Sequence, residues 1–117
     1  MATNIAFQAQ GKTYKGNATT TSQSVLITSD SPCNQIMVAN HQPSGGTGKP
    51  VYFLVSALSN VTVTAPGNGS PQYCLVSPPS TVRTFTVPTQ FTSAGLYVAF
   101  ITDTGTADCY FTPGEGL

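Results

Sequence analysis

Glycine and proline interrupt this chain so often that long helices are excluded. Eleven glycines and nine prolines place a break roughly every eight to fifteen residues along the 117-residue sequence. No window puts apolar residues at positions i, i+3, i+4 and i+7 over three turns, which is the spacing of an amphipathic helix. Short segments between regular breaks are typical of an antiparallel β-sandwich or barrel. The sequence therefore predicts an all-β protein.

Nine segments between the breaks carry the β-branched and aromatic residues that favour strands. They are residues 4–9, 24–29, 35–40, 51–56, 60–64, 72–76, 81–87, 96–103 and 107–112. We expect about eight or nine strands in one antiparallel β-sandwich of jelly-roll type, a single domain over residues 1–117. Residues 1–23 would supply an extra strand or an extended arm. Residues 113–117 would form a C-terminal tail without regular structure.

The apolar residues of segments 51–55 and 96–103 occupy both faces of each predicted strand. A two-layer sandwich buries only one face of each sheet, so a loop or another protein must cover the second face. In segment 81–87 the apolar residues do not share one face, which predicts a bulge or a mixed face. The turn at 103–106 is expected to close a hairpin, with Gly105 supplying a positive φ.

Charged side chains make up only 7% of the chain, against roughly a quarter in an ordinary soluble domain. The four basic and four acidic residues cancel. A chain with this balance has no basic surface to bind nucleic acid. Its longest apolar stretch is far shorter than the roughly 20 residues of a membrane-spanning helix. We therefore expect neither nucleic acid nor a membrane among its partners.

Motifs for catalysis or ligand binding are weak in this sequence. His41 is the only histidine, and Cys33, Cys74 and Cys109 lack the spacing of a zinc site. The N-terminus lacks the pattern of a secretory signal, so we expect reduced thiols. The glycine-rich stretch before Lys49 lacks the first glycine and the final Ser or Thr of a phosphate-binding loop. We expect no enzymatic activity, no cofactor and no bound metal.

The C-terminal quarter of the chain reads GLYVAFITDTGTADCYFTPGEGL over residues 95–117. This ending resembles that of small tailed-bacteriophage head-associated proteins, which finish with a strand, a Thr-Gly turn, a strand and Thr-Pro-Gly-Glu-Gly. The similarity extends back to residue 24 through QIMVAN at 35–40, VYFLV at 51–55 and TFTVP at 84–88. Such proteins include capsid cement or decoration proteins, jelly-roll sandwiches that bind the outer capsid surface and clamp neighbouring capsomers.

The resemblance implies a virion structural protein on the capsid exterior, assembled in the host cytoplasm. Its partners would be the major capsid protein and further copies of itself, as a dimer or trimer. The candidate contacts lie near the N-terminus, in the loop 40–50 and in the tail: Phe7, Tyr14, His41, Lys49, Thr112, Pro113, Glu115 and Leu117. The alternatives are a head–tail adaptor, a tail-fibre or baseplate component, and a carbohydrate- or receptor-binding β-sandwich.

Overall fold

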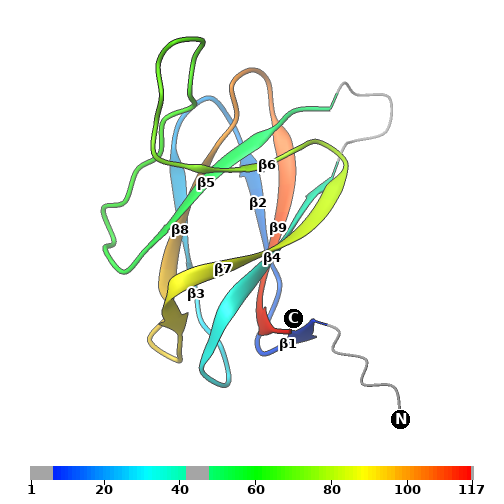
Figure 1. The fold of residues 1–117 in the computed structure, drawn as a ribbon, viewed down its shortest axis with the longest axis vertical. Helices are drawn as coiled ribbons and strands as arrows, with labels where there is room; N and C mark the ends of the chain where they lie inside the picture. Colours follow the sequence, from blue (N-terminus) through cyan, green and yellow to red (C-terminus); the bar gives the residue numbers. More distant parts are fainter. Residues whose placement is uncertain (1–6, 42–47, 117) are drawn as a thin grey trace.

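The computed structural model describes residues 7–41 and 48–116 (Figure 1). Within these ranges the chain forms strands and loops and no helix, as the sequence predicts. The strands are β1 (Gln8–Ala9), β2 (Tyr14–Ala18), β3 (Gln23–Ile27), β4 (Cys33–His41), β5 (Val51–Ser56), β6 (Leu75–Ser77), β7 (Thr81–Phe91), β8 (Leu96–Ile101) and β9 (Ala107–Glu115). Two of them, β1 and β2, lie in the region predicted as an extra strand or an arm.

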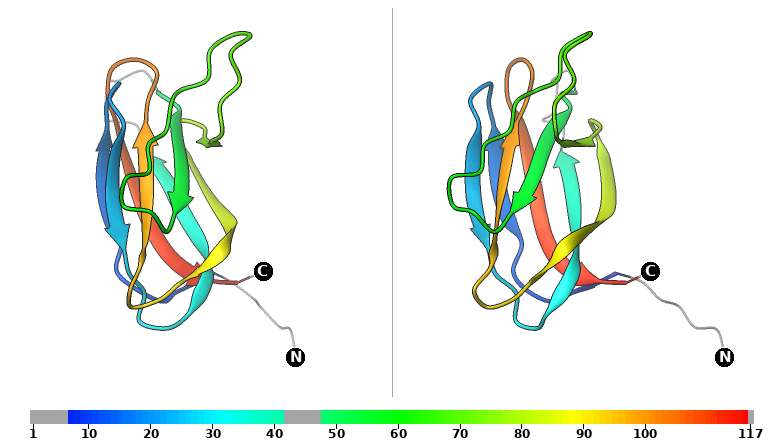
Figure 2. Two further views of the ribbon diagram at one scale, coloured as in Figure 1. Left: turned by 90° about the vertical axis from the view of Figure 1, so that its left-hand side faces the viewer. Right: turned by 60° about the vertical axis from the view of Figure 1, so that its left-hand side comes forward.

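The strands form two antiparallel sheets that pack face to face (Figure 2). Sheet A has the order β1-β9-β4-β7, with β2 also paired to β9, and sheet B has the order β3-β8-β5-β6. From β2 to β9 successive strands alternate between the sheets, except that β5 and β6 pair with each other. Without β1, each layer has four strands, and this alternation between the layers is the jelly-roll arrangement. The expected antiparallel β-sandwich is confirmed.

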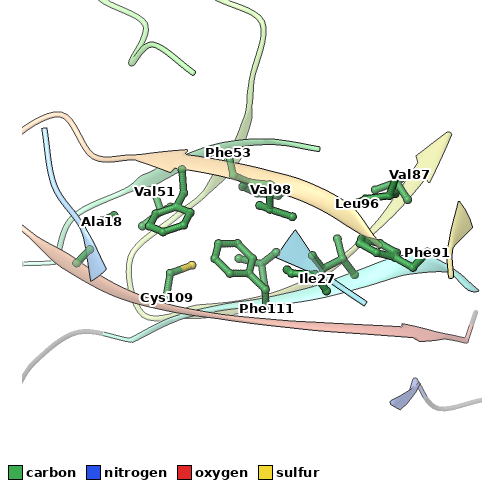
Figure 3. Packing of buried hydrophobic residues seen from close by; sticks show 14 of the residues in the cluster. Ala18, Ile27, Val51, Phe53, Val87, Phe91, Leu96, Val98, Cys109 and Phe111 are labelled. Carbon is green, nitrogen blue, oxygen red and sulfur yellow. The ribbon is translucent and has the colours of Figure 1, made fainter. Parts of the chain in front are cut away.

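The main core lies between the sheets and draws its side chains from both of them (Figure 3). The ring of Phe53 in sheet B meets Phe85 and Phe111 of sheet A edge-on, with centroids 4.9 and 6.2 Å apart. Edge-to-face contacts of this kind are favoured by the aromatic quadrupole. Gly16 of β2 faces the ring of Phe100, which lies where a Cβ atom would be. A residue without a side chain is therefore needed there for the sheets to approach.

A second, smaller core covers the outer face of sheet B. Its buried members are Val63, Ala99 and Ile101, and Val61 is among the partly buried residues that pack against them. Val61 and Val63 belong to the long connection between β5 and β6, which runs along the outside of sheet B (Figure 2). The second apolar face predicted for 51–55 and 96–103 is thus covered by a loop of the same chain.

Of the nine segments predicted as strands, 60–64 is the one that forms no strand in the structure. Its alternating valines contact sheet B from outside, and the backbone N–H of Val63 donates to Ser22 Oγ at 3.0 Å instead of to a neighbouring strand. An alternation of apolar and polar residues indicates which side chains are buried, and in this segment it arises without pairing to a neighbouring strand. The prediction of a strand at 60–64 was wrong for that reason.

The turn at 103–106 joins β8 of sheet B to β9 of sheet A. Gly105 has the expected positive φ, of 68°. The predicted hairpin is nevertheless wrong, because the two strands on either side of the turn do not pair with each other. The chain uses this turn to cross between the layers.

The predicted C-terminal tail is also wrong over most of its length, since β9 continues to Glu115. Pro113 is fully buried and lies opposite Ile36 of β4, and Gly114 lies opposite Ala9 of β1. On its other edge β9 changes partner from β2, which ends its pairing at Phe111, to β1. A residue that lacks an N–H is tolerated at such a junction, where the ladder is already interrupted.

Candidate functional site

The outward-facing side chains of sheet A form an exposed surface, which we call face A. On β9 and β4, residues alternate between the core and this face. The strand register arranges face A in rows. The rows are Asn17–Asp108–His41, Lys15–Tyr110–Ala39–Val82, Thr112–Met37–Thr84 and Gly114–Gln35–Thr86. In the last row Gly114 is buried, because the Phe7 ring lies over it.

Face A is neutral and partly apolar. Val82 is 63% exposed, whereas Met37, Ala39 and Tyr110 are half-buried by their neighbours in the sheet. Threonines occupy much of the remaining surface. The two charges within the rows, Lys15 and Asp108, have opposite signs. Strand alternation in β7 explains the mixed face predicted for 81–87, because Val82 points outward while Phe85 and Val87 point to the core.

Polar contacts between neighbouring strands hold several side chains of face A in place. Asn17 Nδ2 donates to Asp108 Oδ1 at 2.9 Å, and the hydroxyls of Thr13 and Thr112 lie 2.8 Å apart. The Lys15 ammonium lies 5.9 Å from the centroid of the Tyr110 ring, within the range of a cation–π contact. These contacts lie on the part of face A that β2 and β9 form. Met37, Val82 and Thr84 lie on the other part, which β4 and β7 form.

A hollow of about 390 Å³ lies at the His41 end of face A. Its lining includes His41, Val82 and Tyr110, which the strand register brings together from β4, β7 and β9. An imidazole, a phenol ring and an aliphatic side chain thus meet in one place. The hollow lies within the size range of small-ligand sites, although it offers few charged groups.

Two of the predicted contact residues, His41 and Thr112, lie on face A, in different rows. The structure turns two others towards the core. Pro113 is fully buried, and the Tyr14 side chain packs against the core with its hydroxyl 3.2 Å from Thr28 Oγ1. Tyr14 lies on the inward-facing side of β2, since Gly16 and Ala18 on the same side are buried.

The remaining candidates lie at the two ends of the sandwich. Phe7 is half-buried, and its ring occupies the space that a Cβ atom on Gly114 would need. Glu115 is exposed at the end of β9. Lys49 donates from Nζ to Thr104 Oγ1 at 3.1 Å, beside the turn between the sheets. Leu117 and residues 42–47 of the predicted contact loop lie outside the described residues.

Face A also contains residues that the sequence reasoning did not select, chiefly Met37, Val82, Thr84 and Tyr110. Part of the signal was present in 107–112, where Asp108, Tyr110 and Thr112 alternate with the apolar residues of the core. Met37 and Val82 gave no such signal, because an apolar residue in a strand is ordinarily assigned to the core. Their exposure follows from the register of β4 against its neighbours.

The three cysteines are free thiols, and Cys33 and Cys109 are buried. Burial raises the pKa of the Cys109 thiol to about 12. Burial also raises the pKa of Cys33 and of Cys74. Each thiol is therefore held in its protonated, weakly nucleophilic form at neutral pH.

Within residues 7–41 and 48–116, no three His, Cys, Asp or Glu side chains gather where they could hold a metal ion. The same residues include no helix that could cross a membrane. A comparison of the chain with protein-family models, with curated proteins and with solved structures finds no match. Face A and the hollow at its His41 end are therefore the features from which a function can be inferred.

Proposed function

We propose that this chain is a virion structural protein of the capsid cement type, which uses face A to bind the outer surface of a phage capsid. Bound there, it holds neighbouring subunits of the major capsid protein together. The observation that carries this proposal is the difference between the two outer faces of the sandwich. A loop of the chain covers Ala99 and Ile101 in the middle of sheet B and leaves Leu26 and Leu75 exposed on its two edge strands. On face A, Val82 is 63% exposed.

The chemistry of face A supports a lasting contact with another protein. Exposed apolar side chains surrounded by hydroxyls are typical of surfaces that become buried in complexes. Because Lys15 and Asp108 cancel, little of the binding energy would come from long-range charge attraction. The resemblance of residues 24–117 to phage head-associated proteins supports the capsid as the partner. On a repeating shell, many weak contacts act together and give strong overall binding.

The first test is the copy number of this chain in purified particles, measured by quantitative mass spectrometry. A cement protein is expected at a copy number near that of the major capsid protein. Tens of copies or fewer would instead indicate a head–tail adaptor, or a tail-fibre or baseplate component. If the particles lack the chain, the proposal fails.

The second test is binding of variants to particles from which the protein is missing. Met37→Lys places a charge in the middle of face A and should lower occupancy strongly, because a buried unpaired charge opposes docking. Leu58→Lys is the matched control, since Leu58 is 66% exposed on the loop outside sheet B. Wild-type binding should persist in 0.5 M NaCl. If Leu58→Lys abolishes binding and Met37→Lys does not, face A is not the docking surface.

The hollow favours a second candidate function, recognition of a carbohydrate or receptor. Tyr110 offers an aromatic surface for a sugar ring, and His41 offers a hydrogen-bonding group beside it. Saturation-transfer NMR with a panel of methyl glycosides would test this function. Binding that Tyr110→Leu removes would support it, and no signal from any sugar of the panel would reject it.

A further inference from the structure

We propose that a second copy of this chain pairs antiparallel with strand β7 along residues 81–87, so that sheet A continues across a two-fold axis. In the part of the chain that the structure describes, β7 pairs only with β4 and forms one edge of the sheet. It is also the longest strand there, with 11 residues. The free edge of a long strand presents unpaired backbone groups that readily pair with another chain.

The first half of β7 lacks the features that usually protect an edge strand. Residues 81–86 pair with β4 without a break. The irregularity lies further on, because Gln35 and Cys33 of β4 are opposite Thr86 and Phe91 of β7. Pro88, which has no N–H, also lies in that second half. The only charge on the whole strand is that of Arg83.

The sequence of this half-strand is compatible with pairing to an identical strand. A two-fold axis at Thr84 places Thr84 opposite Thr84 of the second copy, and places Arg83 opposite Phe85 of that copy. Val82 then lies opposite Thr86 of the second copy, on the side of face A. No like charges lie directly opposite each other in this register. Pairs of β-branched and aromatic side chains are favourable across antiparallel strands.

The size of face A provides a second argument, which rests on the proposed function. Four strands about 4.8 Å apart, each presenting about seven residues of 3.4 Å, give a face of roughly 450 Å². A stable protein–protein contact buries about 800 Å² per partner. Pairing through β7 would place two copies of face A side by side on one continuous sheet of roughly 900 Å². The pair would then offer the capsid about twice the face that one copy offers.

Sedimentation equilibrium of the purified chain over a concentration series tests the pairing directly. Wild type should form dimers. Thr84→Lys and Thr84→Glu each place like charges opposite each other across the axis, so each should weaken the dimer about fivefold. An equal mixture of the two variants should associate more tightly than either variant alone, because opposite charges then face each other. Thr13→Lys, an exposed site by the opposite edge of sheet A, should behave as wild type.

Several results would overturn the proposal. A wild-type chain that stays monomeric up to about 1 mM would do so, since that is the weak end of useful protein affinities. A dimer would also do so if its Kd were the same in Thr84→Lys as in wild type, with circular dichroism showing that the variant is folded. A mixture that associates no better than its components would exclude this register. Dimers that do not bind capsids would reject the capsid function alone, and monomers that bind capsids would reject the pairing alone.

Discussion

Replacing Val63 by alanine tests whether the loop outside sheet B is part of the folded core in solution. Val63 is only 4% exposed and packs on the outer face of β8 with Ala99 and Ile101. Its backbone N–H is held by Ser22 Oγ at 3.0 Å, so the loop is attached at the same point by a polar contact. The substitution removes two methyl groups and leaves that hydrogen bond in place.

The expected cost follows from the burial of those two groups. Each buried methyl or methylene group contributes about 0.8 kcal/mol, and the cavity left behind adds to this. We therefore expect Val63→Ala to lower the free energy of unfolding by about 1.5–2.5 kcal/mol. For a chain of 117 residues, 1 kcal/mol corresponds to about 4 °C in Tm. The Tm should accordingly fall by about 6–10 °C.

Urea unfolding followed by circular dichroism measures this loss, and Val82→Ala is the matched control. The control makes the same chemical change at a valine that is 63% exposed, so it should cost about 0.5 kcal/mol or less. Equal effects of the two substitutions would refute the packing of the loop on sheet B. That face would then be open to a partner, and the contrast on which the proposed docking face depends would disappear.

Two further predictions concern the end of β9 and the buried thiol. Gly114→Ala should cost about 1–3 kcal/mol and speed hydrogen exchange around residues 7–10, because its Cβ would overlap the Phe7 ring and the Gln8 carbonyl oxygen. Gly67→Ala, whose Cβ would make only ordinary contacts, is the control, and unchanged exchange in Gly114→Ala would show that this contact is absent. Since folding raises the pKa of Cys109 from 9.0 to about 12, its contribution to stability is complete below pH 9 and is lost as the pH rises towards 12. Urea titrations at several pH values measure the free energy of unfolding of wild type and of Cys109→Val. Above pH 9, the free energy of unfolding of wild type should fall by up to about 1.4 kcal/mol per pH unit more than that of Cys109→Val. Plots of unfolding free energy against pH that run parallel for the two proteins would contradict this.

Strand positions were largely predictable from the sequence, because alternating burial is a local property. Eight of the nine predicted segments contain or overlap a strand, and the apolar second face of 96–103 is evident from the sequence alone. The failure at 60–64 has the same origin. Val61 and Val63 alternate with polar residues because they pack on sheet B, and a sequence pattern does not distinguish such packing from a β-ladder.

The candidate site was less predictable than the fold. Of the predicted contact residues, His41 and Thr112 lie on face A, whereas Tyr14 is half-buried with its side chain against the core and Pro113 is fully buried. Pro113 was predicted to be a contact residue because a Pro-Gly segment was expected to end the strand and begin a tail. The structure shows that β9 continues through it, because β4 supplies a partner on one side and β1 resumes the pairing on the other.

The sequence by itself determined that this chain forms short strands, that it carries too few charges for a basic or acidic surface, and that two strands need cover on both faces. The tertiary structure decided what provides that cover, which sheet each strand joins and which face stays open. The physical reason is that periodicity and turn residues act over a few neighbours. The partner of a strand depends on hydrogen bonds and packing between segments far apart in the chain, such as β2 with β9.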